Sequence, residues 1–190
     1  MEGIEPSENY ESNSGPEEGS GQSAEQLIKI FYTSFQRGDW KGMLTVYHPD
    51  IYFYDPVFGN LEGPRVAAMW EMLLSSAKGL DLQFGRTITG EGYGSCYWTA
   101  TYLFTSTGRR VVNKGKALFK FSEGKIIEHH DDFSLWEWCA QALGWRGLLF
   151  GWTSVLQNKV RHKARTSLER FMGAKKAAGD RPTTADQLNS

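Results

Sequence analysis

The sequence predicts an α+β fold, because two different hydrophobic periods occupy separate parts of the chain. Apolar residues recur at helical spacing over most of residues 24–77, alternate as in strands over 80–134, and return to helical spacing over 135–172. Helices followed by a run of strands are typical of an antiparallel sheet covered by helices. The chain of 190 residues is long enough for one domain with its own core, plus tails.

Three helices are expected ahead of the main run of strands. The first begins with the capping box Ser23–Gln26 and ends at Gly38. A shorter helix runs through Trp40–Tyr47. The third begins at Gly63 and Pro64, because proline fits the first turn of a helix, and its apolar stripe consists of Val66, Met69, Trp70, Leu73, Leu74 and Ala77.

A strand is expected at residues 51–55, and four more follow Gly79. Alternation with a period of two places these four near 80–89, 95–106, 110–121 and 125–134. Turn residues between them, such as Thr107-Gly108 and Glu123-Gly124, predict short hairpin connections. The four strands should therefore form an antiparallel meander.

Both ends of the chain are predicted to be disordered. Residues 1–22 contain six Glu and no Lys or Arg, so they cannot bury enough apolar surface to offset the entropy of ordering. The predicted organisation is an acidic tail (1–22), a folded domain (23–138), a basic amphipathic helical extension (139–176) and a second tail (177–190).

Composition narrows the class of protein. The net charge of −1 argues against nucleic acid as a partner, and an aromatic content of 14% indicates large apolar surfaces that are buried or hold a ligand. Cys96 and Cys139 have no metal-type spacing and are expected to be reduced core residues. Since there is no signal-peptide pattern and no apolar run of about 18 residues, we expect a soluble cytoplasmic protein.

Asp55 is the first candidate for chemistry, because it lies at the end of an apolar strand face. Side chains two apart in a strand point the same way, so Asp55 shares a face with Ile51 and Phe53. In an apolar cavity the pKa of its carboxyl group would be raised, which suits a general base. The alternative is a turn aspartate that accepts hydrogen bonds from backbone amides near Pro56.

Asn113 is the one polar residue on the predicted inward face of the strand at 110–121. The lysines of this strand lie on the opposite face, and the small residues Gly115 and Ala117 suggest open space beside Asn113. Asn113 could either face a ligand in that space or satisfy a neighbouring backbone group.

The last strand contains five consecutive titratable residues, Glu128–Asp132, of which two are histidines and three are acidic. Alternation puts His129, Asp131 and Phe133 on one face, but the adjacent isoleucines before them do not decide which face points inward. His129 and Asp131 are close enough to share a site. No more than two of the four His and Asp side chains can reach one ion, so no metal site is predicted, and no motif indicates a cofactor.

In the order and spacing of three features, the chain resembles the nuclear transport factor two-like superfamily, which includes SnoaL-like proteins and ketosteroid isomerases. The features are a first helix that ends at Arg37-Gly38-Asp39, a strand that ends at Asp55-Pro56-Val57, and the segment 124–131. The resemblance covers roughly residues 24–138. It implies a cone, in which a curved antiparallel sheet and three helices enclose one deep pocket, with inward-facing Asp55, Asn113, Ala117, His129, Asp131 and Phe133.

The resemblance to ketosteroid isomerases is partial. Asp55 matches the position of their general base, which shuttles a proton. The tyrosine and the neutral aspartic acid of their oxyanion hole fall on Phe31 and Ala117, whose side chains donate no hydrogen bond. Each missing donor is worth roughly 3–4 kcal/mol, so steroid isomerisation is not expected.

The SnoaL-like resemblance implies acid–base chemistry by a pocket His and Asp on polyketide-type or similar carbonyl substrates, and related epoxide hydrolases of the same fold activate water with polar pocket residues. The implied reaction is therefore of the isomerase, cyclase or hydrolase type. On this basis His129 exchanges protons near neutral pH, Asp55 or Asp131 acts as base, and Asn113 orients a substrate oxygen or water. We expect a homodimer that binds a small, largely apolar oxygenated molecule against Phe31, Trp70, Trp98, Tyr102, Asn113, Ala117 and Phe133. The alternative is a non-catalytic ligand-binding or dimeric module, whose polar residues form a satisfied buried network.

The extension carries ten apolar residues at helical spacing between Leu148 and Met172, and seven basic side chains surround them. We expect one long helix that packs across the outer face of the sheet or in a dimer interface, and that is needed for solubility rather than for chemistry. The alternative is an amphipathic helix that makes weak contact with an anionic membrane.

Overall fold

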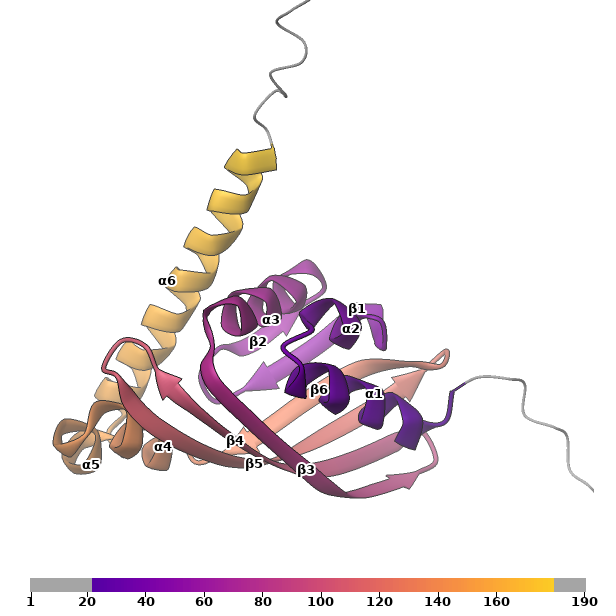
Figure 1. Ribbon diagram of the computed structural model, residues 1–190, viewed down its shortest axis with the longest axis horizontal. Coiled ribbons are helices and arrows are strands. Elements are labelled where there is room, and N and C mark those ends of the chain that lie inside the picture. The colour runs from indigo at the N-terminus through magenta and orange to yellow at the C-terminus, as the bar shows by residue number, and fades with distance from the viewer. Residues whose placement is uncertain (1–21, 180–190) are drawn as a thin grey trace, which may run out of the picture.

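The computed structural model describes residues 22–179 and confirms the predicted α+β fold, with N-terminal helices, a curved six-stranded sheet and a long C-terminal helix (Figure 1). The helices are α1 (Ala24–Gln36), α2 (Trp40–Leu44), α3 (Pro64–Ser76), α4 (Leu135–Leu143), α5 (Trp145–Phe150) and α6 (Ser154–Gly179). The strands are β1 (Tyr47–Asp55), β2 (Gly59–Glu62), β3 (Lys78–Gly90), β4 (Tyr93–Phe104), β5 (Arg109–Ser122) and β6 (Lys125–Phe133).

The predicted tails lie almost wholly outside the described residues. The second one overlaps the structure by a few residues, because α6 continues to Gly179.

The sheet runs in the order β2-β1-β6-β5-β4-β3. All neighbouring strands pair antiparallel except β1 and β6, which are parallel. The sheet curves around α1, α2 and α3 (Figure 1). Apolar side chains from these helices and from the inner face of the sheet form the core, which includes Leu27, Ile28, Phe31, Phe53, Met69, Trp70 and Phe119.

One local prediction of secondary structure needs correction, and one strand was not predicted. The second helix ends at Leu44 rather than at Tyr47, because Tyr47 already belongs to β1 and pairs with Ile126 of β6. The strand that was not predicted is β2, which follows a turn after Asp55 and pairs with β1. Gly59 begins β2 with a φ of 68°, a conformation that glycine adopts without the steric cost of a side chain.

A bulge in β6 decides which face of that strand points inward. Lys120 pairs with Glu128 and Phe121 with Ile126, so Ile127 is an extra residue in β6. The extra residue shifts the alternation, and as a result both Ile126 and His129 are buried. His129 and Asp131 therefore lie on the inner face of the sheet.

The C-terminal extension consists of three helices, not the single one that its period predicts. Gly144, with a φ of 66°, separates α4 from α5, and residues 151–153 separate α5 from α6. The expected packing across the outer face of the sheet is wrong: α6 packs beside α3 with Leu168 buried (Figure 1). Within residues 22–179, no helix combines the length and the apolar character needed to cross a membrane.

Candidate functional site

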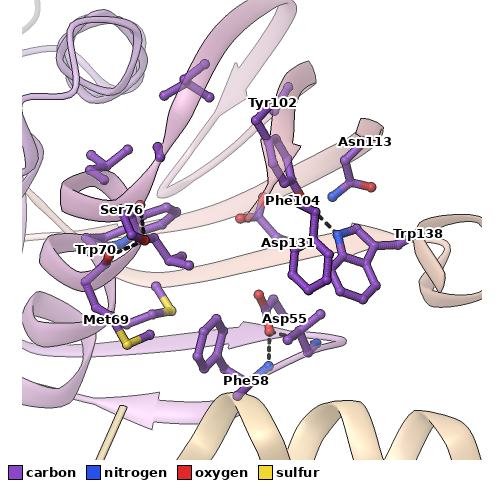
Figure 2. Close-up of a pocket in the computed structure, with 18 of the residues that line it drawn as sticks. Asp55, Phe58, Met69, Trp70, Ser76, Tyr102, Phe104, Asn113, Asp131 and Trp138 are labelled. Atoms are coloured by element: carbon purple, nitrogen blue, oxygen red, sulfur yellow. Dashed lines mark hydrogen bonds between the residues drawn. The ribbon is translucent and has the colours of Figure 1, made fainter. Parts of the chain in front are cut away.

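The inner face of the sheet borders a cavity of about 460 Å³. Helices α1 and α3 close one side of it, and residues of α4 and α6 border another part. Most of the lining is apolar. Four side chains with acidic, phenolic or amide groups reach the cavity from the strands β1, β4, β5 and β6, and these are Asp55, Tyr102, Asn113 and Asp131 (Figure 2). A fifth, Tyr32, reaches it from α1.

Asp55 combines the two arrangements that the sequence left open. Its Oδ1 atom accepts hydrogen bonds from the backbone amides of Val57, at 2.9 Å, and Phe58, so it organises the turn between β1 and β2. Asp55 also lines the cavity, and only 8% of its surface is exposed. Since both hydrogen bonds end on Oδ1, Oδ2 is the oxygen available to a ligand.

Burial changes the acidity of Asp55. It raises the pKa of the carboxyl group from 3.8 to about 7, although the amide of Phe58 partly offsets the effect, and the charge of Asp131 raises the pKa further. A carboxyl group with a pKa near neutral pH can both accept and return a proton.

Tyr102 presents a proton donor to the same cavity. The indole Nε1 of Trp138 donates a 2.8 Å hydrogen bond to the Tyr102 hydroxyl oxygen, so the hydroxyl proton itself remains free to bind a ligand (Figure 2). Burial raises the pKa of Tyr102 above its usual value, and the charge of Asp55 adds to this effect. Tyr102 is therefore a protonated donor within electrostatic range of Asp55.

Asn113 is buried, lines the cavity and makes no side-chain hydrogen bond to the residues that the structure describes. The alternative in which it satisfies a neighbouring backbone group therefore does not hold. Its amide is a second polar group available to a ligand.

Asp131 is held by a tryptophan. Nε1 of Trp98 donates a 2.8 Å hydrogen bond to Oδ1 of Asp131. The sequence predicted open space at Gly115, but the Trp98 ring fills it: a Cβ atom on Gly115 would lie 2.5 Å from Cζ2 of Trp98. The absence of a side chain at Gly115 thus allows Trp98 to reach Asp131.

Replacing Gly115 with valine is expected to displace the Trp98 ring, weaken its hydrogen bond to Asp131 and lower the free energy of unfolding by about 1–3 kcal/mol. Urea unfolding and the near-ultraviolet circular dichroism of tryptophan measure the two effects. Gly85→Ala is the matched control, because a Cβ at Gly85 meets no atom within 4 Å. Unchanged dichroism in Gly115→Val would contradict the assigned role.

His129 lies behind the cavity rather than at its surface. Its exposure is 0%, and it is surrounded by the rings of Phe31, Tyr47, Phe53, Trp70 and Phe119. Nδ1 shares a hydrogen bond with the Tyr47 hydroxyl, and Nε2 lies 3.4 Å from Oδ1 of Asp131 but outside hydrogen-bond geometry. His129 therefore contacts Asp131, as its spacing predicted, but does not border a ligand.

Of the remaining residues predicted to contact a ligand, one is buried away from the cavity and the others line it. Ala117 pairs with Asp131 in the sheet but is completely buried and does not border the cavity, so its predicted contact with a ligand needs correction. The residues that do line it are Phe31, Trp70, Trp98, Tyr102, Asn113 and Phe133.

Sequence reasoning missed Tyr32 and Trp138 as site residues. Tyr32 lines the cavity beside Phe31, and its buried hydroxyl has no hydrogen-bond partner among the described residues. Trp138 supports Tyr102. The concentration of tryptophan in the extension was a visible signal, but the contact with Tyr102 joins residues 36 positions apart.

Sequence reasoning also assigned α6 no part in the site. Val160, Lys163, Ala164 and Ser167 of α6 line the cavity. In addition, Nε of Arg161 donates a 2.9 Å hydrogen bond to the Pro56 carbonyl, and Nε of Arg165 donates one of 2.7 Å to the Phe58 carbonyl. Helix α6 therefore holds the same turn whose amides bind Asp55.

No three His, Cys, Asp or Glu side chains within residues 22–179 are placed to hold a metal ion.

Several solved structures share this fold at low sequence identity. A proposed polyketide cyclase from Pseudomonas putida is 21% identical, with a TM-score of 0.53 over 64% of this chain and 98% of that chain. A similar protein from Xanthomonas campestris is 21% identical, with a TM-score of 0.53 over 61% of this chain and 93% of that chain. A protein of ketosteroid isomerase-like fold from Catenulispora acidiphila, solved in complex with trimethylamine, is 10% identical, with a TM-score of 0.56 over 63% and 94%.

At these identities the likeness concerns the fold, which is NTF2-like. No curated protein sequence matches the chain significantly. The model of the SnoaL-like domain family matches residues 28–129, which run from α1 to His129 in β6 and take in Asp55, Tyr102 and Asn113. Since this match covers more than half of the chain and agrees with the observed cone, the protein belongs to the SnoaL-like domain family.

Proposed function

We propose that the protein catalyses proton transfer at a carbon atom next to a carbonyl group, in a small and largely apolar molecule. The observation that carries this proposal is the position of Asp55, a carboxyl group with a pKa of about 7 that lines an apolar cavity opposite two uncommitted hydrogen-bond donors. The relatives of this fold described as proposed polyketide cyclases support a carbonyl substrate.

The proposed reaction uses Asp55 as the base. Oδ2 of the ionised carboxylate takes the proton from the carbon, the C–H electron pair forms a C=C bond, and the carbonyl π electrons move to oxygen. The enolate oxygen then carries the charge. If Asp55 returns the proton to the same carbon, the result is exchange of that proton. If the substrate has a neighbouring C=C bond, the proton can return to its far carbon, which completes an isomerisation. In a cyclisation the enolate carbon bonds to a second carbonyl carbon, the π electrons of that carbonyl move to its oxygen, and Asp55 gives its proton to this alkoxide while the first carbonyl re-forms.

Tyr102 and Asn113 are the proposed donors to the enolate oxygen. The Tyr102 hydroxyl is already oriented by Trp138, and the Asn113 amide has no competing side-chain hydrogen bond to the described residues. These groups replace the donors that are absent at Phe31 and Ala117. A preoriented donor in a water-poor cavity stabilises a developing oxyanion by roughly 3–4 kcal/mol.

Asp131 and His129 have a different proposed role from Asp55. Oδ1 of Asp131 is bound by Trp98 and contacted by His129, and His129 is in turn fixed by Tyr47. Asp131 is therefore proposed to bind a polar group of the substrate, and His129 to be a positioning residue that acts through Asp131. The predicted use of His129 as a proton carrier to the ligand would require it to reach the cavity.

Hydrogen–deuterium exchange tests the proposal before the natural substrate is known. With β-tetralone as an apolar ketone in deuterated buffer, proton NMR should show protein-dependent loss of the signal of the carbon-bound protons next to the carbonyl. Because a positioned general base contributes about 10²–10⁴-fold, Asp55→Asn should lower the rate by at least about 100-fold. The rate should rise with pH and level off above about 7, as Asp55 loses its proton.

Asp132→Asn is the matched control, because Asp132 lies on the same sheet but is exposed to solvent. Its rate and pH profile should equal those of the unchanged protein. Binding of the ketone to the wild-type protein, without exchange above that of Asp55→Asn, would instead support the non-catalytic binding module. The predicted homodimer remains a proposal, for which sedimentation velocity is the measurement.

A further inference from the structure

Helix α5 buries a glycine and exposes its large apolar side chains. A short surface helix normally buries its large apolar residues, yet here the buried residue is Gly147. A side chain at Gly147 would overlap the carbonyl oxygen of Cys139, so glycine is what allows α5 to lie directly on α4. Gly151, which follows α5, is buried against the same helix. The fold therefore fixes α5 so that its large side chains point outward.

Helix α5 lies at one end of the molecule (Figure 1), and its large apolar side chains and those of its neighbours are exposed there. Trp145 is 65% exposed and Trp152 is 70% exposed. Half of the exposed large apolar residues that the structure describes lie between positions 136 and 155. We call this set the α5 surface, and its members are Trp136, Trp145, Leu148, Leu149, Phe150, Trp152 and Val155.

The charges around the α5 surface are basic. Arg146 and Lys159 border a shallow groove together with Trp145, Phe150 and Val155. Acidic residues are rare in this part of the chain: between positions 134 and 179 the only ones are Glu137 and Glu169, and Glu169 is paired with Arg65. Basic residues are more numerous over the same range, namely Arg146, Lys159, Arg161, Lys163, Arg165, Arg170, Lys175 and Lys176.

We propose that the α5 surface docks onto an anionic lipid bilayer, with its tryptophans and leucines at the headgroup boundary and its basic residues against lipid phosphates. Tryptophan is favoured at that boundary because its ring is apolar and its N–H is polar. Basic side chains beside the inserted residues add attraction to anionic lipids. The sequence-based alternative placed the whole apolar stripe from Leu148 to Met172 on the membrane. The structure restricts the exposed part of that stripe to its beginning, up to Val155, because Leu168 is buried in the domain.

The charges favour lipid over a second copy of the chain. In a two-fold contact the same surface meets itself, so Arg146 and Lys159 would face basic groups of the partner. The acidic residue nearest to Arg146 in the sequence is Glu137, and its single negative charge cannot balance the two positive charges of Arg146 and Lys159. An anionic bilayer complements both the apolar and the basic parts of the surface.

Residues that flank the α5 surface along the chain line the cavity. Leu143, just before α5, and Val160 of α6 both line the cavity. If the proposed function is correct, docking would bring the cavity close to a phase in which apolar carbonyl compounds concentrate. That consequence rests on the proposed function, whereas binding to lipid does not and is tested separately.

Co-sedimentation of the full chain with vesicles tests the docking. We expect binding to vesicles of phosphatidylcholine mixed with phosphatidylglycerol, with a blue shift of tryptophan fluorescence, and at least about ten-fold weaker binding to phosphatidylcholine alone. Two double variants, Trp145→Ser/Trp152→Ser and Arg146→Glu/Lys159→Glu, should each lower the partition coefficient at least about ten-fold, since the apolar and the electrostatic contributions are both needed.

Matched controls alter equally exposed residues elsewhere. Ile88→Ser/Tyr93→Ser removes exposed apolar side chains from the β3–β4 hairpin, and Lys29→Glu/Lys114→Glu reverses exposed charges on α1 and β5. Both should bind vesicles as the unchanged protein does. Circular dichroism of all variants verifies the fold.

Two outcomes would overturn the proposal. One is equal sedimentation with and without vesicles. The other is a concentration-dependent dimer that Trp145→Ser/Trp152→Ser abolishes, which would assign the surface to a second copy. Proton exchange in β-tetralone is measured without lipid, so a failure of docking and a failure of the proposed chemistry are distinguishable.

Discussion

Asp55→Asn is expected to make the protein more stable above neutral pH, although it removes the proposed base. The asparagine side-chain oxygen can accept the same hydrogen bonds from the amides of Val57 and Phe58. It carries no charge, so the cost of burying an ionised carboxylate disappears. The gain in the free energy of unfolding at pH 8 should be roughly 2–4 kcal/mol.

The pH dependence follows from the direction of the pKa shift. Burial raises the pKa of Asp55 from 3.8 to about 7, so between these values the folded state holds a proton that the unfolded state has lost. The stability of the unchanged protein should therefore fall by up to about 4 kcal/mol as the pH rises through this range and then level off. The stability gained by Asp55→Asn should be near zero at pH 4.

Urea unfolding of both proteins from pH 4 to pH 8 measures this difference. Asp132→Asn, which alters an exposed carboxyl group, should show no comparable gain. An Asp55→Asn protein that is less stable at every pH would mean that Asp55 serves the turn alone, and the assignment as a base would fail.

The double substitution Arg161→Ala/Arg165→Ala is expected to impair both folding and chemistry. It removes two hydrogen bonds from α6 to the carbonyls of Pro56 and Phe58. Hydrogen bonds from charged donors are worth about 1.5–3 kcal/mol each, and the partial exposure of these arginines reduces that value. We therefore expect a loss of roughly 2–3 kcal/mol in the free energy of unfolding.

The effect on chemistry follows from the turn that these arginines hold. The amides of Val57 and Phe58 bind Asp55, so a looser turn weakens these hydrogen bonds and admits water to the carboxyl group. Weaker amide hydrogen bonds raise the pKa, but burial is the largest cause of the shift, so the admitted water has the greater effect and lowers the pKa toward the usual range. The exchange rate with β-tetralone should fall about ten-fold, because a misplaced base loses part of its contribution. The midpoint of the pH profile should move below 7.

Arg170→Ala is the control from the same helix, because Arg170 is exposed and makes no hydrogen bond or ion pair to the described residues. A double variant that loses stability but keeps both the rate and the midpoint of the pH profile would show that α6 has no influence on Asp55.

The sequence alone determined the features that depend on near neighbours along the chain. The capping box at Ser23 fixes the start of α1, and period-two alternation located all the long strands to within a few residues. Alternation also put Asp55 on an apolar face and His129 beside Asp131, because both relations hold within one strand. The order of these elements was enough to predict the α+β class, and the resemblance to the superfamily implied the cone.

Contacts between distant segments decided the rest. The β6 bulge at Ile127, visible only in the pairing with β5, set the inward face of His129 and Asp131. The Trp98 ring occupies the space that was predicted beside Gly115. Aromatic rings enclose His129, so its side chain does not reach the cavity. The period of the extension could not show that α6 would hold the Asp55 turn or that α5 would expose its large side chains. Periodicity reports which side of an element is apolar, whereas the partner of that side, and the space left between them, depend on how the whole chain packs.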